Sequence, residues 1–284
     1  MSMTENAKPR LVVFTDLDGT LLDHDSYDFS PALPALAALH AANVPLILCS
    51  SKTRTELEYW SSQLNINHPF ISENGGVLAI PHDYFKQQFD FHDEQNGYRL
   101  IILGEGYATL RKALKKIAKR AYLPLLGFGD MTIAQVAQHT GLPIEQAARA
   151  KIRDADEPFF IERTFGDEEV KRLEEVVARA QLRLTRGGRF FHLIGKSDKG
   201  LAARRLIELY QAEWGMQIQT VALGDSPNDV PLLQAVDIPI NVQKKNGEID
   251  SAVQAHVNAK LTTKSGPSGW NEAVLELLHN ASHG

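Results

Sequence analysis

The sequence predicts an α/β fold with a parallel sheet and an inserted second domain. Short apolar runs, such as residues 11–15 and 44–49, alternate with longer amphipathic or alanine- and leucine-rich stretches. This is the pattern of buried parallel strands joined by helices. The alternation stops near residue 83 and resumes after residue 190. Two of the apolar runs are followed by aspartate-rich turns, at the end of the strands where open parallel sheets bind ligands.

The first part of the chain is expected to fold as strand, helix, strand, helix and strand. These elements are placed at residues 11–15, 31–42, 44–49, 53–64 and 70–72. Pro34 falls in the first turn of the first helix, where a missing N–H is tolerated. Thr53 and Glu56 form a capping-box pattern at the start of the second helix. Right-handed crossovers would bring the three strands into one parallel sheet.

The middle of the chain carries its own set of helices and strands. We expect helices at residues 108–121, 132–139, 143–151 and 167–181, and strands at 98–103, 158–162, 182–185 and 189–194. The parallel pattern resumes with a helix at 199–214, a strand at 220–223, a helix at 228–235, a strand at 238–242 and a final helix at 271–278. The sequence therefore predicts a core of residues 1–82 and 191–284 and an inserted domain of residues 83–190.

Composition argues against several classes of protein. The 284 residues carry a net charge of -5 at pH 7, so no basic excess is available to neutralise nucleic-acid phosphates. No apolar run approaches the ~20 residues that span a bilayer, and the first ten residues are polar, without a signal-peptide core. A single cysteine, Cys49, rules out an internal disulfide framework and suits a reducing compartment. We expect a cytoplasmic protein with no nucleic-acid or membrane partner; the sequence predicts no oligomeric state.

Two acidic segments lie more than two hundred residues apart. Asp16-Leu17-Asp18-Gly19-Thr20 follows the first strand, and Gly224-Asp225-Ser226-Pro227-Asn228-Asp229 follows the strand at 220–223. If these strands are neighbours, the four aspartates at 16, 18, 225 and 229 converge, and so many carboxylates do not stay ionised together without a cation. Hard oxygen ligands favour a divalent ion, with Mg²⁺ as the first candidate.

The first segment suits phosphoryl transfer. One of its carboxylates can attack a phosphorus atom and form an aspartyl-phosphate, and the other can protonate the leaving oxygen and later activate water. The alternative is a calcium loop, because Asp-x-Asp-Gly begins an EF-hand pattern. No helix precedes it, however, and Tyr27 stands at the twelfth position in place of glutamate.

Two further residues are candidate phosphate ligands. Ser50 ends the second strand, where its hydroxyl and the following N–H groups could hold phosphoryl oxygens. Lys199 begins a long helix and could neutralise charge on the phosphate and the nucleophile. Lys196, three residues upstream, is the competing lysine. A helix N-cap serine and a solvated surface lysine are the alternative interpretations.

Taken in order, these motifs resemble the four motifs of the haloacid dehalogenase (HAD) superfamily. They are Asp16-x-Asp18-x-Thr20, Ser50, Lys199 and Gly224-Asp225-x-x-x-Asp229. The resemblance implies a Rossmannoid core with a parallel sheet and an α/β cap inserted between the second and third motifs, as in the Cof-type branch. It also implies that Asp16 is the nucleophile and Asp18 the general acid/base. Mg²⁺ would be held by Asp16, the Asp18 carbonyl and Asp225, with Asp229 as a further ligand or a supporting partner.

Finer motifs resemble the mannosyl-3-phosphoglycerate phosphatase family. They are Ser50-Ser51-Lys52-Thr53, Glu73-Asn74-Gly75-Gly76, Gly127-Phe128-Gly129-Asp130-Met131 and Arg186-Gly187-Gly188-Arg189-Phe190. The resemblance implies hydrolysis of mannosyl- or glucosyl-3-phosphoglycerate, a phosphorylated sugar glycerate, to the sugar glycerate and phosphate. Rival functions are a sucrose-phosphate type of phosphatase, a phosphomannomutase and a ligand-binding protein without turnover.

Four residues are candidate substrate contacts. Arginine recognises carboxylates and phosphates through paired hydrogen bonds, so we expect Arg189 to contact the substrate from the cap. Lys52 is the expected contact from the core, and Glu73 and Asn74 could bind sugar hydroxyls. The alternatives are an exposed strand-end arginine at Arg189 and a plain turn at residues 73–74.

Overall fold

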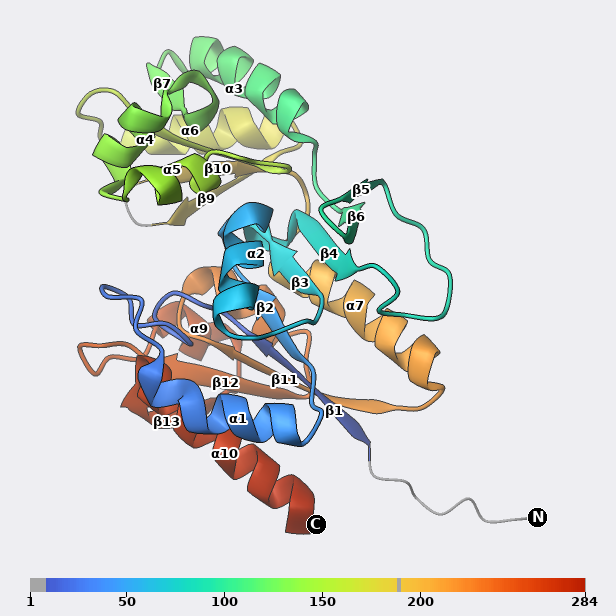
Figure 1. Cartoon of the computed structure of the whole chain (residues 1–284). Helices are drawn as coiled ribbons and strands as arrows, with labels where there is room; N and C mark the ends of the chain where they lie inside the picture. Colours follow the sequence, from blue (N-terminus) through green and yellow to red (C-terminus); the bar gives the residue numbers. More distant parts are fainter. Residues whose placement is uncertain (1–8, 188–189, 284) are drawn as a thin grey trace.

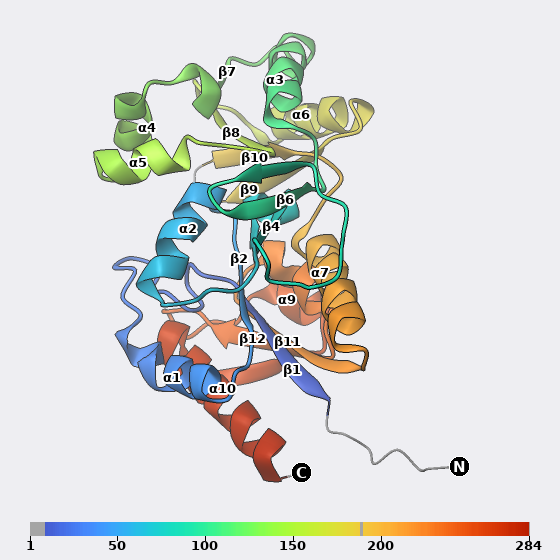
Figure 2. The same ribbon diagram turned by 45° about the vertical axis from the view of Figure 1, so that its right-hand side comes forward.

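The structure is a computed structural model of the chain that describes residues 9–187 and 190–283. It contains a large mixed sheet and a smaller sheet at one end of it (Figures 1 and 2). The large sheet has nine strands in the order β13-β12-β11-β1-β2-β3-β4-β6-β5. Its parallel strands are β1 (Arg10–Thr15), β2 (Leu46–Cys49), β3 (Phe70–Ser72), β11 (Ile218–Gly224), β12 (Ile238–Gln243) and β13 (Lys260–Ser265).

An antiparallel extension completes one edge of the large sheet. It consists of β4 (Val77–Pro81), β5 (Asp93–Gln95) and β6 (Tyr98–Ile102). Because β5 and β6 pair here, residues 93–102 belong to the large sheet and lie outside the inserted unit that we expected to begin at residue 83. The boundary is displaced because strand pairing, which residue order alone does not show, carries the chain back to the core.

Helices cover both faces of the large sheet. In β1, Val13 points to a cluster with α1 (Leu33–Ala41), α2 (Arg54–Gln63) and α10 (Gly266–His283). Its neighbours Val12 and Phe14 point to the opposite cluster with α7 (Lys199–Trp214), α8 (Val230–Leu233) and α9 (Ser251–His256). Both faces of β1 are therefore buried, which explains its continuous apolar run.

The smaller sheet is antiparallel, in the order β7-β8-β10-β9. Its strands are β7 (Leu125–Gly127), β8 (Asp156–Ile161), β9 (Arg183–Gly187) and β10 (Phe190–Ile194). α3 (Tyr107–Ala121) and α6 (Asp167–Arg179) pack on one face, and α4 (Ile133–Thr140) and α5 (Ile144–Ala150) pack at the other. We call residues 107–194 the cap region. β10 lies in it, although the expected core resumed at residue 191.

The predicted fold class is confirmed. The capping box of α2 forms as expected, since the Thr53 side chain accepts a bond from the Glu56 N–H and Glu56 Oε2 accepts one of 2.9 Å from the Thr53 N–H. Asp198 caps α7 by accepting a hydrogen bond of 2.8 Å from the N–H of Leu201. Among the helices of the described residues, none is both long enough and apolar enough to cross a membrane.

Candidate active site

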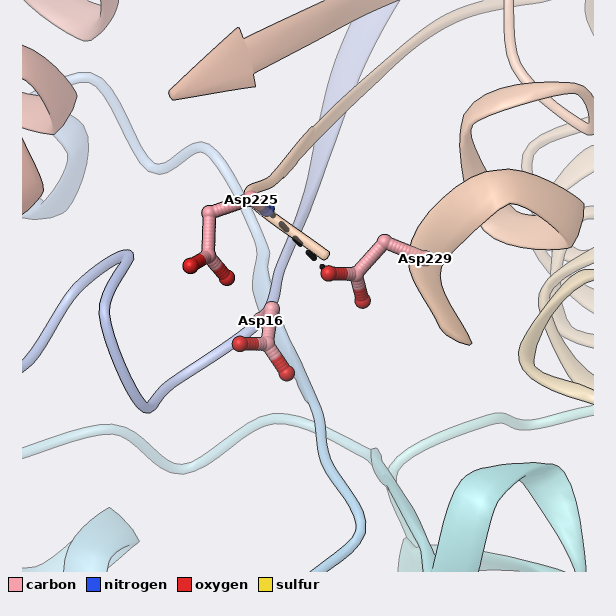
Figure 3. A group of neighbouring side chains, drawn as sticks. All are labelled: Asp16, Asp225 and Asp229. Atoms are coloured by element: carbon pink, nitrogen blue, oxygen red, sulfur yellow. Dashed lines mark hydrogen bonds between the residues drawn. The ribbon is translucent and has the colours of Figure 1, made fainter. Parts of the chain in front are cut away.

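The two acidic segments meet at the carboxyl ends of neighbouring strands. β1 and β11 pair in parallel, with Thr15 opposite Leu223, and the N–H of Asp16 donates to the Leu223 carbonyl at 2.9 Å. This pairing places Asp16 beside the turn that holds Asp225 and Asp229. Figure 3 shows the three side chains next to one another, and each offers an oxygen within 4.8 Å of the others.

Lys199 lies buried among these carboxylates. Its Nζ donates at 2.6 Å to Asp16 Oδ1 and at 2.6 Å to Asp229 Oδ1. The lysine reaches this position from the first turn of α7, whose start is fixed by the Asp198 cap. Lys196, the competing candidate, is exposed. The geometry therefore selects Lys199 as the lysine of the acidic cluster.

The electrostatics of the cluster leave it short of positive charge. Burial, together with the negative charge of Asp229, raises the pKa of the Asp16 carboxyl well above its ordinary value, and the Lys199 ammonium offsets this only in part. Burial and the charge of Asp229 also raise the pKa of Asp225 to about 7. Burial disfavours a charged Lys199, but the carboxylates of Asp16 and Asp229 raise its pKa above the ordinary value. One ammonium does not neutralise three clustered carboxylates.

The donor set fits a hard divalent cation. Asp16 Oδ2 and Asp225 Oδ2 accept no hydrogen bond from the residues that the structure describes, whereas both oxygens of Asp229 are engaged. Asp229 Oδ2 accepts from the N–H groups of Asp225 at 3.2 Å and Ser226 at 3.1 Å. Free carboxylate oxygens on Asp16 and Asp225 are the ligands that such an ion prefers.

Asp18 lies at the mouth of the cluster and is partly exposed. Its Oδ2 pairs with Lys52 Nζ at 2.8 Å. The chain can turn away after Asp18 because Gly19 adopts a φ of +84°, and a Cβ there would lie 2.7 Å from Asp225 Oδ2. Thr20 Oγ1 donates to Asp225 Oδ1 at 3.3 Å. The first acidic segment thus orients Asp225 as well as supplying its own carboxylates.

Ser50 is buried at the end of β2. Its Oγ accepts a bond of 3.2 Å from the Lys52 N–H, and its carbonyl accepts one of 3.0 Å from the Asn74 N–H. These contacts fix the strand-to-helix turn that we predicted as a phosphate site. They also match the alternative interpretation of Ser50 as a turn-capping residue, so its phosphate role stays a prediction.

A cleft of about 580 Å³ opens over the cluster between the core and the cap region. Asp16, Asp18 and Asp225 form its floor, and Arg186 from β9 reaches it from the cap region. Its other walls come from three connecting segments and the start of α10. They include Asp23, His24, Asp25, Asn228, Lys244, Lys245, Asn246 and Pro267. The described lining of the cleft thus offers three cations, Arg186, Lys244 and Lys245, among more numerous carboxylates, so an anionic ligand above the aspartates would also need a bound cation.

The four predicted substrate contacts differ in their position relative to the cleft. Lys52 lies next to the cluster, and the carboxylates of Asp18 and Glu56 raise its pKa against the effect of burial. Asn74 accepts a bond of 3.1 Å from Asn228 Nδ2, and Asn228 lines the cleft. Glu73 is turned away: its Oε1 and Oε2 accept bonds of 2.9 and 2.7 Å from the N–H groups of Asp154 and Ala155. Arg189 lies outside the described residues.

Sequence reasoning missed Arg186 and the cationic loop around Lys244 and Lys245. Arg186 belongs to the same Arg-Gly-Gly-Arg run from which we selected Arg189. Arg186 pairs with Phe191 across β9 and β10, and this strand register is not visible in the sequence. The two lysines follow β12, so the rule that strand ends carry ligands could have found them.

Comparison with known proteins agrees with this geometry. Residues 13–102 match the model of the haloacid dehalogenase-like hydrolases. A glucosyl-3-phosphoglycerate/mannosyl-3-phosphoglycerate phosphatase of Methanococcoides burtonii is 42% identical, over 94% of this chain and 97% of its own. One of the same name from Persephonella marina is 39% identical, over 96% and 99%. The chain belongs to this phosphatase family.

Solved structures support the same fold at greater distance. A HAD-superfamily phosphatase of Bacteroides thetaiotaomicron aligns with a TM-score of 0.68 at 15% identity, covering 98% of each chain. A protein of Thermoplasma acidophilum aligns with a TM-score of 0.66 at 18% identity, covering 96% of this chain and 99% of its own. The resemblance predicted from the four motifs is confirmed, and with it the class of phosphoric monoester hydrolases.

Proposed function

We propose that this chain removes the phosphate of mannosyl-3-phosphoglycerate or glucosyl-3-phosphoglycerate in a Mg²⁺-dependent reaction in the cytoplasm. The observation that carries the proposal is the buried set of Asp16, Asp225 and Asp229 around Lys199, at the floor of a cleft lined by Arg186 and Lys244. The substrate follows from the names of relatives that are 39–42% identical over nearly the whole chain.

The first half-reaction transfers the phosphoryl group to Asp16. A carboxylate oxygen of Asp16 forms a bond to phosphorus while the bond from phosphorus to the glycerate oxygen breaks. Asp18 gives its proton to that oxygen as it leaves. The ion pair of 2.8 Å between Lys52 Nζ and Asp18 Oδ2 positions the Asp18 side chain, which takes up a proton before it acts as the acid. The products of this step are the sugar glycerate and an aspartyl-phosphate.

The second half-reaction hydrolyses the intermediate. Asp18, now a carboxylate, takes a proton from water as the water oxygen attacks phosphorus. The bond between phosphorus and the Asp16 oxygen breaks, which restores the Asp16 carboxylate and releases inorganic phosphate. Ser50 and Lys199 stabilise the charge on the phosphoryl oxygens in both steps. Asp229 is a positioning residue, because it holds Lys199 and the loop at Asp225.

The proposed Mg²⁺ would be held by Asp16, Asp225 and the main-chain carbonyl of Asp18. When bound, it supplies positive charge that neutralises the carboxylates and the transferring phosphoryl group. Asp229 is a less suitable ligand, since its two oxygens already accept bonds from Lys199 and from main-chain N–H groups. We also propose that the cap region selects the substrate, with Arg186 as the arginine that meets an anionic group.

A substrate panel tests the proposal. The purified full chain is assayed for phosphate release from the two sugar phosphoglycerates, sucrose phosphate and mannose 1-phosphate, with Mg²⁺ and with a chelator. We expect release from the sugar phosphoglycerates that requires Mg²⁺ and falls by at least about 1,000-fold in Asp16→Asn. Isomerised sugar phosphate would indicate a mutase, and native turnover by Asp16→Asn would exclude the covalent intermediate.

A further inference from the structure

A second cavity lies on the other side of the Lys52–Asp18 pair. It measures about 300 Å³ and is formed by the loop before α1, by α2 and by α5 of the cap region. Lys52 is a wall of this cavity, while Asp18 lines the cleft of about 580 Å³. The two spaces are therefore neighbours across the ion pair of 2.8 Å between these residues. A ligand with its phosphate at Asp16 could therefore extend past Lys52 into the second cavity.

The lining of the second cavity differs in character from that of the catalytic cleft. Three neighbouring aromatic rings form one wall: Trp60 lies 6.0 Å from Tyr27 and 5.4 Å from Tyr59 between ring centroids. Gln63 from α2 and Gln146 from α5 add neutral donors and acceptors, and Lys52, Glu56 and Arg149 add charged ones. The catalytic cleft contains no phenylalanine, tyrosine or tryptophan among its described lining residues. Its charged or titratable residues are 16, 18, 23, 24, 25, 186, 225, 244 and 245. The catalytic cleft suits an anionic group once a cation offsets its carboxylates, whereas the aromatic wall and the amides of the second cavity suit a polyhydroxylated ring with one apolar face.

Hydrogen bonds join the two walls of this cavity, α2 of the core and α5 of the cap region. The carbonyl of Arg149, at the end of α5, accepts bonds of 3.1 Å from the hydroxyls of Thr53 and Thr55 at the start of α2. The Arg149 guanidinium lies over the Tyr59 ring at 4.4 Å. A ring bound here would contact the core through Trp60 and the cap region through Gln146. It would therefore be recognised only when both parts are in place.

We infer that this cavity binds the hexosyl group of the substrate, with Trp60 and Tyr27 against the ring face and Gln146 on its hydroxyls. The inference rests on the proposed function and adds to it the site of sugar recognition. The phosphate and the glycerate carboxylate remain in the catalytic cleft, next to Arg186 and Lys244. Lys52 then lies at the branch point between the anionic and the sugar parts of one ligand.

The kinetic test compares two substrates that differ in the sugar. Gln146→Leu should raise the KM for mannosyl-3-phosphoglycerate about fivefold, and Trp60→Leu about tenfold. For 3-phosphoglycerate, which has no sugar, the same variants should change KM by less than about twofold. Gln138→Leu, the same substitution at an exposed position of α4, is the matched control and should alter neither constant.

A binding measurement is independent of turnover. The chain has three tryptophans; Trp270 is fully buried and Trp214 stacks under Arg10. Addition of mannosylglycerate, which carries no phosphate, should change the tryptophan fluorescence of the wild type, and Trp60→Phe should lose that change. Fluorescence that responds equally in Trp60→Phe would place the sugar elsewhere.

The outcomes separate the two proposals. If the wild type hydrolyses the sugar phosphoglycerates and the Gln146 and Trp60 variants keep their KM, the cavity assignment is wrong and the proposed function stands. An equal rise of KM for both substrates would likewise overturn it, because the cavity would then act on the phosphoglycerate or on the fold. If the wild type releases phosphate from neither sugar ester, the proposed function and the sugar site are both wrong.

Discussion

Lys199 carries the positive charge that the buried carboxylates of Asp16 and Asp229 share. Lys199→Met removes this charge and leaves both carboxylates unpaired, so we expect a loss of about 3–5 kcal/mol in the free energy of unfolding. In the protein that stays folded, kcat should fall at least about 100-fold. Urea unfolding and phosphate release measure the two effects.

Lys196→Met is the matched control for this prediction. Lys196 is exposed and lies three residues before Lys199 on the same connection, so its replacement should leave both stability and kcat near the wild-type values. A larger loss of kcat at Lys196 than at Lys199 would show that the wrong lysine has been placed beside the phosphate.

Glu73 should make stability depend on pH. Burial raises the pKa of this carboxyl from 4.5 to about 8, so between these values the unfolded chain loses the proton while the folded chain keeps it. The free energy of unfolding contributed by Glu73 is therefore greatest below pH 4.5 and falls as the pH rises to about 8. Each pKa unit corresponds to about 1.4 kcal/mol. The contribution of Glu73 to the free energy of unfolding should therefore fall by a few kcal/mol over this pH range.

Urea unfolding at a series of pH values, for the wild type and Glu73→Gln, isolates this contribution. Glu73→Gln loses an acceptor for one main-chain N–H at every pH, so it should be less stable at low pH, and its stability should vary less with pH. Glu145→Gln, at an exposed glutamate of α5, should retain the wild-type slope. A wild-type slope in Glu73→Gln would contradict the raised pKa.

For single residues, the sequence predicted which residue types meet at the active site, but not the direction of every side chain. The convergence of Asp16, Asp225 and Asp229 could be predicted because they follow two strands that pair in parallel, whereas the Asp18 carboxylate lies at the mouth and pairs with Lys52. The direction of Glu73 could not be predicted, since its left-handed φ of 51° turns the side chain toward Asp154 and Ala155. That conformation is set by tertiary contacts and leaves no signal in the neighbouring residues.

At the scale of elements, the contact between the 3-10 turn η2 (Glu73–Gly75) and the start of α7 positions Lys199. Gly75 has a φ of +90°, and a Cβ there would overlap the main-chain carbonyl of Asp198. Gly75→Ala should therefore displace the start of α7, lower the free energy of unfolding by about 3 kcal/mol or more, and reduce kcat. Thermal unfolding and phosphate release give the two readouts.

Gly97 provides a control with the same backbone conformation. Its φ is +82°, yet a Cβ there meets nothing within 4 Å. Gly97→Ala should lose only the conformational cost of about 1–2 kcal/mol and keep its kcat. If both alanine variants lose the same stability and neither loses activity, the contact with Asp198 has no role in placing Lys199.

Most strands with a buried apolar run were predicted, and polar edge strands were not. β4 (Val77–Pro81) was missed although its run is apolar and buried. The strands at β1, β2, β3, β11 and β12 have continuous apolar runs because both faces are buried. β5 is Asp93-Glu94-Gln95, entirely exposed, and β13 buries one residue of six. Such strands form by pairing with the exposed edge of an existing sheet. Their own residues therefore need no hydrophobic pattern.

For the molecule as a whole, a bound cation should stabilise the folded state. The ligand set of Asp16 and Asp225 comes from β1 and β11, over two hundred residues apart in sequence, and it exists only in the folded chain. Mg²⁺ at 100 times its dissociation constant should add about 2.7 kcal/mol to the free energy of unfolding, or several degrees in Tm. Differential scanning fluorimetry with and without Mg²⁺ measures this shift.

Asp225→Asn should abolish most of the Mg²⁺-dependent shift in Tm, because the amide replaces a charged ligand. Asp90→Asn, at an exposed aspartate far from the cleft, should keep the wild-type shift. NaCl at the same ionic strength should not reproduce the shift in Tm that Mg²⁺ produces. A shift that persists in Asp225→Asn would place the stabilising ion at another site.

The core and the cap region are joined by two connections that touch each other. A Cβ at Gly104 would lie 2.9 Å from Ser197 Oγ, and one at Gly195 would lie 2.5 Å from the N–H nitrogen of Glu105. These close approaches leave no room for a larger side chain at either glycine. The second linker leads within a few residues to Lys199, so a substitution that separates the two linkers should also displace the ammonium among the carboxylates and lower turnover.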